Sequence, residues 1–94
     1  MRVRWTPLAF DHLGSVHDYV AADSPAAADE VVDRILSAAK TLARFPELGR
    51  HGRVAETREL VITGTPFIVA YRIRRDQIQI LAVLHGARRW PEKF

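Results

Sequence analysis

Three apolar segments follow one another between residues 57 and 91, and this stretch constrains the fold more than any other part of the chain. Each segment has the length and the β-branched and aromatic content of a strand. Only two residues lie in each gap, Gly64-Thr65 in the first and Arg75-Asp76 in the second. Connections this short join antiparallel neighbours. The sequence therefore predicts a meander of three strands, at roughly 56–63, 66–74 and 77–85.

The second hairpin of this meander has one face that is apolar throughout and one that is mixed. With a turn at Arg75-Asp76, residues whose numbers sum to 151 lie opposite each other. The apolar face needs a cover of helices, and it comprises Phe67, Val69, Tyr71, Ile73, Ile78, Ile80, Ala82 and Leu84. The mixed face has Ile68, Ala70, Leu81 and Val83 at its centre and Arg72, Gln79 and His85 at its margins. We expect this mixed face to be an open binding surface for an amphipathic peptide or another macromolecule; the alternative is a face that simply tolerates polar residues.

Two amphipathic helices precede the meander. Each begins with a cap residue followed by proline, Thr6-Pro7 in the first and Ser24-Pro25 in the second. Apolar residues recur at helical spacing in both; they are Ala9, Leu13, Val16 and Val20, then Val31, Ile35, Ala38, Leu42 and Phe45. Pro46 and Gly49 end the second helix. The connection between the helices is so short that they form an antiparallel hairpin.

A short alternating segment, Arg2–Trp5, reads as a first strand whose pairing partner the sequence leaves open. The expected fold is therefore α+β with the order β-α-α-β-β-β. A helical hairpin packs on one face of a mainly antiparallel four-stranded sheet. The chain of 94 residues forms one domain, 1–94.

Charge is distributed unevenly along the chain. Residues 1–49 carry a net charge of −2 and residues 50–94 a net charge of +5, within a total of +3. The basic half suggests an anionic partner, such as a nucleic acid or an acidic protein segment, with a solvated basic face as the alternative. The apolar runs are too short to cross a bilayer, and the chain has no cysteine, so we expect a cytoplasmic protein without contact to a membrane.

The side chains with the strongest binding chemistry follow the last strand. Arg88 and Arg89 can engage phosphate or carboxylate, and Trp90 can stack on a partner or pack on the core, of which packing is favoured. Arg58 shares its parity with Leu60 and Ile62 if the first turn has two residues, and a register slip of one residue would move it to the open side. The full set of residues expected to contact a partner or target is Arg58, Arg72, Gln79, His85, Arg88, Arg89 and Trp90.

Catalysis without a metal would need His85, Arg72 and Arg88 to act together. The imidazole could move a proton while the guanidinium groups stabilise charge on a phosphate, as in a metal-free ribonuclease. The sequence predicts no metal site, because His12 and His17 are five residues apart and not four. It also contains no phosphate-binding or dinucleotide-binding motif, so no cofactor is expected.

Five short motifs occur in a fixed order along the chain. They are WTP at Trp5, FPELGR at Phe45, TRELV at Thr57, FIVAYRI at Phe67 and ILAVLHGARRWP at Ile80. Their combination, over residues 5–91, resembles the RelE/ParE family of toxins from bacterial type II toxin–antitoxin modules. The resemblance implies a toxin that arrests growth until a cognate antitoxin wraps around it. This antitoxin is expected to be acidic, DNA-binding and similar to ParD or RelB.

The family has two branches, and the residues distinguish them. ParE-like members inhibit DNA gyrase by binding it, whereas RelE-like members cut messenger RNA on the ribosome without a metal. RelE-like ribonucleases typically carry a catalytic arginine in an Arg-Leu-Val-Tyr run where this chain has Ile68. His85 matches a Leu-His ending common in ParE-like sequences, Arg88 matches a basic position after the last strand, and no tyrosine follows Trp90. The resemblance therefore favours gyrase; the alternatives are the nuclease, with His85, Arg72 and Arg88 catalytic, and a basic nucleic-acid-binding domain without toxicity.

Overall fold

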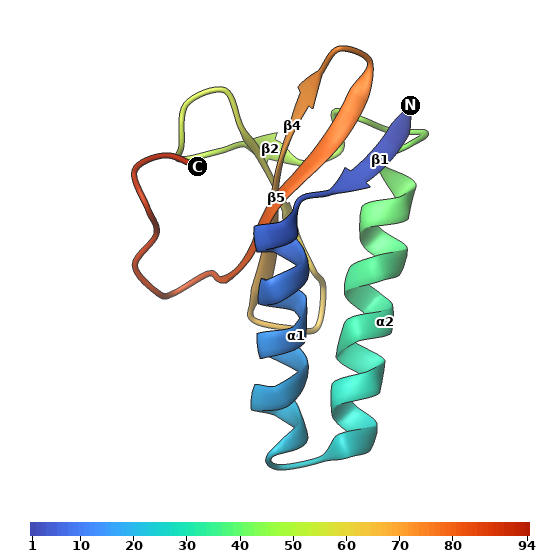
Figure 1. The fold of residues 1–94 in the computed structure, drawn as a ribbon, viewed down its shortest axis with the longest axis vertical. Helices are drawn as coiled ribbons and strands as arrows, with labels where there is room; N and C mark the ends of the chain where they lie inside the picture. The colour runs from blue at the N-terminus through green and yellow to red at the C-terminus, as the bar shows by residue number, and fades with distance from the viewer.

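The computed structural model describes residues 1–94, and Figure 1 shows a helical hairpin beside a twisted sheet. The elements in chain order are β1 (Arg2–Trp5), α1 (Pro7–Ala21), α2 (Pro25–Thr41), β2 (Arg50–His51), β3 (Arg58–Val61), β4 (Phe67–Arg74) and β5 (Gln77–His85). The α+β class, the helical hairpin and the three-stranded meander are as the sequence predicts. Neither helix is long and apolar enough to span a membrane.

The helices begin where their caps predict. The Thr6 hydroxyl accepts a hydrogen bond from the Ala9 N–H at 3.3 Å, and the Ser24 hydroxyl accepts one from the Ala27 N–H at 3.2 Å. Helix α2 ends earlier than its apolar stripe suggests, because the Leu42 N–H bonds three residues back to the Ala39 carbonyl and tightens the last turn. Phe45 consequently leaves the stripe and is exposed.

The sheet has five strands in the order β1-β5-β4-β3-β2, one more than expected. The additional strand, β2, is only two residues long and pairs Arg50 with Glu59 and His51 with Arg58. Two residues cannot display an alternating pattern, so the sequence does not indicate this strand. Strand β1 runs parallel to β5, from Arg2 beside Gln77 to Trp5 beside Ile80, which answers the question that the sequence left open.

A β-bulge changes the register of the second hairpin. From the turn up to the pair Tyr71–Ile80 the strands align as predicted, but Ala70 then faces Ala82, which leaves Leu81 as the extra residue. Beyond this point the predicted register is wrong by one residue. Val83 instead of Leu84 joins the core under the helices. His85 lies opposite Phe67, with the two rings 5.9 Å apart, and does not continue the face that carries Arg72.

The expectation that the mixed face is open is also wrong at its centre. Ile68, Ala70, Leu81 and Ala82 are all buried. Figure 1 shows the loop at 52–57 and the tail at 86–94 on the opposite side of the sheet from α2. The tail lies so close that a Cβ on Gly86 would be 3.0 Å from the Cδ1 atom of Ile68. Only the margin of this face, with Arg72 and Gln79, is half-exposed.

Candidate functional site

The residues that the sequence selects for binding lie at opposite ends of the sheet. Near the β4–β5 turn, the Arg72 Nε donates to the Gln79 Oε1 at 2.7 Å. His85 lies at the far end, beside Phe67, which is five residues from Arg72 along β4. Five residues of strand span roughly 17 Å. Metal-free catalysis would need His85, Arg72 and Arg88 to meet at one place. The structure holds Arg72 at the opposite end of the sheet from His85, so the three do not meet.

Arg58 is engaged with the chain's own loop. It lies opposite Tyr71, on the helix-facing side, as its predicted parity requires. Its guanidinium donates to the Gly49 carbonyl at 2.7 Å and to the Glu47 carbonyl at 3.4 Å. These bonds fix the segment between α2 and β2, so the guanidinium is already occupied within the chain.

Four of the predicted residues meet in a cleft of about 340 Å³ between α1, the end of β5 and the tail. We call it the α1–tail cleft. It is lined by His12, Ser15, Val16, Tyr19, Phe67, Val83, Leu84, His85, Arg88, Arg89 and Trp90. His85, Arg88, Arg89 and Trp90 come from the sequence prediction. His12 and Tyr19 were missed, although their spacing of seven residues places them on one face of α1.

Two imidazoles in the α1–tail cleft are held in defined orientations. The Nδ1 atom of His12 accepts the Val83 N–H at 3.2 Å, at an edge of β5 that β1 leaves unpaired beyond Ile80. The Nδ1 atom of His85 accepts the Ala87 N–H at 3.1 Å. A ring nitrogen that accepts a hydrogen bond carries no proton, so each neutral ring carries its proton on Nε2. Burial lowers the pKa of His12 more than the Asp11 carboxylate raises it, which favours the neutral ring.

Trp90 packs against the protein, as the sequence favoured. Its Nε1 donates to the His85 carbonyl at 3.1 Å, and the Arg53 guanidinium lies 3.7 Å from the centre of the indole. Such stacking joins the tail to the loop at 52–57 through a cation–π contact. Arg88 has a looser contact of this kind, 5.8 Å from the centre of the Tyr19 ring.

A buried carboxylate holds Arg53 in place beneath Trp90. Glu59 is 2% exposed and accepts hydrogen bonds from the Arg53 N–H at 2.7 Å, from Arg53 Nε at 3.1 Å and from Arg50 Nη2 at 3.0 Å. Burial raises the pKa of Glu59, but the bonds from Arg53 and then Arg50 outweigh burial and hold the pKa below its ordinary value. The sequence offered no signal for this network, because its partners meet only through the fold.

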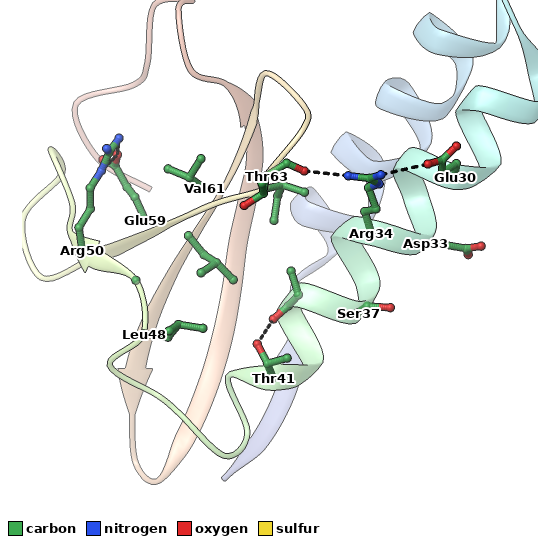
Figure 2. Close-up of a pocket in the computed structure, with 14 residues that line it drawn as sticks. Glu30, Asp33, Arg34, Ser37, Thr41, Leu48, Arg50, Glu59, Val61 and Thr63 are labelled. Carbon is green, nitrogen blue, oxygen red and sulfur yellow. Dashed lines mark hydrogen bonds and ion pairs between the residues drawn. The ribbon is translucent and has the colours of Figure 1, made fainter.

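A second concave surface, the α2–β3 groove, lies between α2, β3 and the segment before β2 (Figure 2). Its volume is about 810 Å³. Leu48 and Val61 are exposed in it and give it an apolar floor. Arg34 reaches across one end, where it donates to the Thr63 carbonyl at 3.1 Å and to Glu30 at 3.1 Å (Figure 2). The groove is thus apolar between charged margins. No three His, Asp or Glu side chains in the structure are grouped so that they could hold a metal ion.

Comparison with known proteins gives consistent matches along the whole chain. The model of the ParE toxin family, described as the ParE toxin of the type II toxin–antitoxin system parDE, matches residues 3–90. A relative from Sinorhizobium fredii whose name is given as "Putative toxin Y4kP" is 45% identical over 91 residues, which are 97% of this chain and 94% of the relative. Toxin RelE2 of Caulobacter vibrioides is 36% identical over 87 residues, which are 93% of this chain and 97% of that protein.

A solved structure has the same fold. It is described as the chromosomal ParDE TA system from P. aeruginosa, and it superposes with a TM-score of 0.81 at 30% sequence identity. The match covers 88% of this chain and 92% of the other. The sequence is therefore similar to those of proteins named as toxins, and the arrangement of helices and strands is similar to that in a solved structure of a ParDE system.

Proposed function

The chain belongs to the ParE toxin family of type II toxin–antitoxin systems, and we propose that it arrests growth by binding DNA gyrase rather than by cutting messenger RNA. One observation carries the choice: Arg72 and His85 lie roughly 17 Å apart along the sheet, too far to act on one phosphate. A general base and the cations that stabilise its transition state must contact the same group. Inhibition by binding needs only an accessible surface. A cytoplasmic location accords with such a target.

The position of Ile68 supports the same choice. This residue stands where RelE-like ribonucleases carry a catalytic arginine, and its side chain is buried against the tail at Gly86. An RNA phosphate could reach this position only if the tail moved away. The neighbouring apolar residues of the mixed face are buried in the same way.

Membership of the family implies a cognate antitoxin, and we place a segment of it in the α2–β3 groove. An amphipathic helix buries its apolar side in such a groove. Leu48 and Val61 are 56% and 49% exposed, which leaves apolar surface for a partner to cover. Arg34 and Arg50 lie at the margins of the groove with side chains 50% and 58% exposed, and each is already paired with a carboxylate of the chain, Glu30 and Glu59. Carboxylates of an acidic antitoxin would have to share these guanidinium groups, so the apolar floor carries the placement.

A pair of matched substitutions tests this placement. Leu48→Glu puts a charge into the floor of the groove, whereas Leu36→Glu makes the same change at an exposed leucine of α2 that does not line the groove. We expect Leu48→Glu to weaken antitoxin binding at least about tenfold in a calorimetric titration and Leu36→Glu to change it little. Equal effects of the two changes would refute the placement.

The target is tested in cells that make the toxin without its antitoxin. Incorporation of labelled nucleoside into DNA and of labelled amino acid into protein are followed separately after induction. We expect DNA synthesis to stop first while messenger RNA stays intact. An early loss of translation together with cut transcripts would refute the gyrase proposal.

A messenger RNA endonuclease is the second candidate, favoured by similarity to the protein named RelE2. In this case Arg88 and His85, which do share the α1–tail cleft, would act without Arg72. Primer extension on cellular transcripts distinguishes the two candidates. Cleavage sites that disappear in the Arg88→Ala protein would support the nuclease, and uncut transcripts would exclude it.

A further inference from the structure

The α1–tail cleft carries positive charge that nothing in the chain neutralises. We propose that it binds a nucleoside monophosphate, either free or at the end of a strand. Of its lining residues, Arg88 and Arg89 are charged and exposed, and none is Asp or Glu. Neither arginine takes part in any of the ion pairs of the structure. Two free guanidinium groups at the mouth of a cleft are suited to a phosphate, which they can bind through paired N–H donors. This site does not depend on the gyrase proposal, and it shares His85 and Arg88 with the nuclease candidate.

The two imidazoles add donors of fixed direction. Because the Nδ1 atoms of His12 and His85 both accept backbone N–H groups, the Nε2 atoms are the ones left to donate to a ligand. The His12 ring is bonded to the backbone of Val83, and the His85 ring extends from its own position on β5. These two positions are two residues apart on the strand, which is roughly 7 Å. Both rings line the same cleft. A phosphate held by Arg88 can therefore receive further N–H donors from the walls of the cleft.

Tyr19 supplies a platform for a base. Its side chain is 66% exposed, and Arg88 lies over the ring at 5.8 Å from its centre. Stacking of a base on an exposed aromatic ring contributes without regard to sequence. The cleft volume of about 340 Å³ falls within the range of small-ligand pockets, roughly 300–1,000 Å³. An aromatic platform beside paired arginines matches a base joined to a phosphate.

An extended peptide fits this cleft less well than a nucleotide. The end of β5 has a free edge there, which is the usual place for a peptide to add a strand. The N–H of Val83 on this edge is already bonded to His12, and α1 lies alongside. Strand addition would have to break this bond.

The experiment uses the full chain in solution, with adenosine monophosphate as the probe. Two-dimensional NMR follows the indole N–H of Trp90 and the amide of Val83 during the titration. We expect saturable shifts at millimolar concentrations, much weaker shifts with adenosine or with inorganic phosphate alone, and about tenfold weaker binding in the Arg88→Ala/Arg89→Ala protein. Tyr19→Ala, a change at an exposed side chain, should also weaken binding of the monophosphate.

Arg74→Ala/Arg75→Ala is the matched control, because it removes the same charge at the opposite end of the sheet. It should leave the binding of adenosine monophosphate unchanged. A 5′-phosphorylated dinucleotide that binds at least as tightly would identify a strand end as the ligand, and weaker binding would identify a free nucleotide. Equal losses in the two double variants, or no saturable shift with either probe, would overturn the proposal.

Discussion

Replacing Glu59 with alanine removes the carboxylate that ties three segments of the chain together. Glu59 lies on β3, and its partners Arg50 and Arg53 lie on β2 and in the loop at 52–57. Arg53 in turn stacks on Trp90 of the tail. We expect Glu59→Ala to destabilise the fold and to loosen the tail, because Arg53 loses the anchor that positions its guanidinium.

The magnitude follows from what each partner loses. The Arg50 and Arg53 side chains are 58% and 41% exposed, so water can solvate their guanidinium groups again, and each ion pair contributes at most about 1 kcal/mol. The Arg53 N–H loses an acceptor 2.7 Å away, which costs about 1–3 kcal/mol if nothing replaces it. These contributions sum to about 1–5 kcal/mol. The middle of this range, about 3 kcal/mol, corresponds to a fall in Tm of roughly 12–24 °C for a domain of this size.

Urea denaturation followed by circular dichroism measures the loss. Because the chain also contains Trp5, the fluorescence of Trp90 is read in a Trp5→Phe background, where it reports the tail. Glu30→Ala is the control, since Glu30 pairs with Arg34 on an exposed helix face and should cost less than about 0.5 kcal/mol. The lowered pKa of Glu59 also makes the stability of the fold depend on pH. The ionised Glu59 stabilises the folded state fully above its ordinary pKa of 4.5, and this stabilisation is lost as the pH falls through the lower pKa of the folded state. If the Glu59→Ala protein were no less stable than the Glu30→Ala protein, the Glu59 network would contribute no more than an exposed ion pair.

Three further changes test other parts of the fold. Tyr71→Phe should cost about 1–3 kcal/mol in urea denaturation, because the buried hydroxyl accepts from the Gly49 N–H at 2.9 Å and donates to the Pro46 carbonyl. Gly64→Ala should cost about 1 kcal/mol, since φ is +80° at this turn; a neutral result would contradict the turn geometry. The hydrogen bond to Asp29 raises the pKa of His17. The protonated His17 therefore stabilises the helical hairpin below its ordinary pKa of 6.5, and this stabilisation is lost as the pH rises through the pKa of His17 in the folded state. Denaturation of His17→Gln between about pH 6 and 8 should lack this dependence.

The elements that the sequence predicts well are those with local signals. Thr6-Pro7 and Ser24-Pro25 start the helices at the expected residues, because a cap and a proline act within one turn. β5 begins and ends where its pattern places it, at Gln77 and His85. The register of the second hairpin is also correct near the turn, where the two-residue connection sets it. The predicted cover of its apolar face does not extend to Ile73, which is 38% exposed.

The features that the sequence does not predict arise from contacts between distant residues. Leu81 has no feature in the sequence that distinguishes it from other strand residues, yet it is the extra residue of the bulge. The bulge moves each later residue of β5, up to His85, to the opposite face of the sheet from the one predicted. The closed mixed face depends on Arg53 meeting Trp90, which lie 37 positions apart in the chain. No periodic pattern reveals such a pairing.

The candidate site was half predicted for the same reason. Arg88, Arg89 and Trp90 are conspicuous in the sequence and do share a cleft with His85. Arg72 was grouped with them because the predicted register put it on the same face as His85. His12 looked like an isolated histidine on a helix, and only the free edge of β5 explains its place in the site.

The proposed function is measured in a reaction with purified DNA gyrase. The toxin, released from its antitoxin, is titrated into a reaction in which gyrase supercoils relaxed plasmid, and a parallel reaction contains translating ribosomes with a defined messenger RNA. We predict that supercoiling falls as the toxin concentration rises, that the antitoxin restores it, and that the messenger RNA stays intact. Full supercoiling activity at every toxin concentration, together with messenger RNA cut on the ribosome, would show that the toxin is a nuclease and not an inhibitor of gyrase.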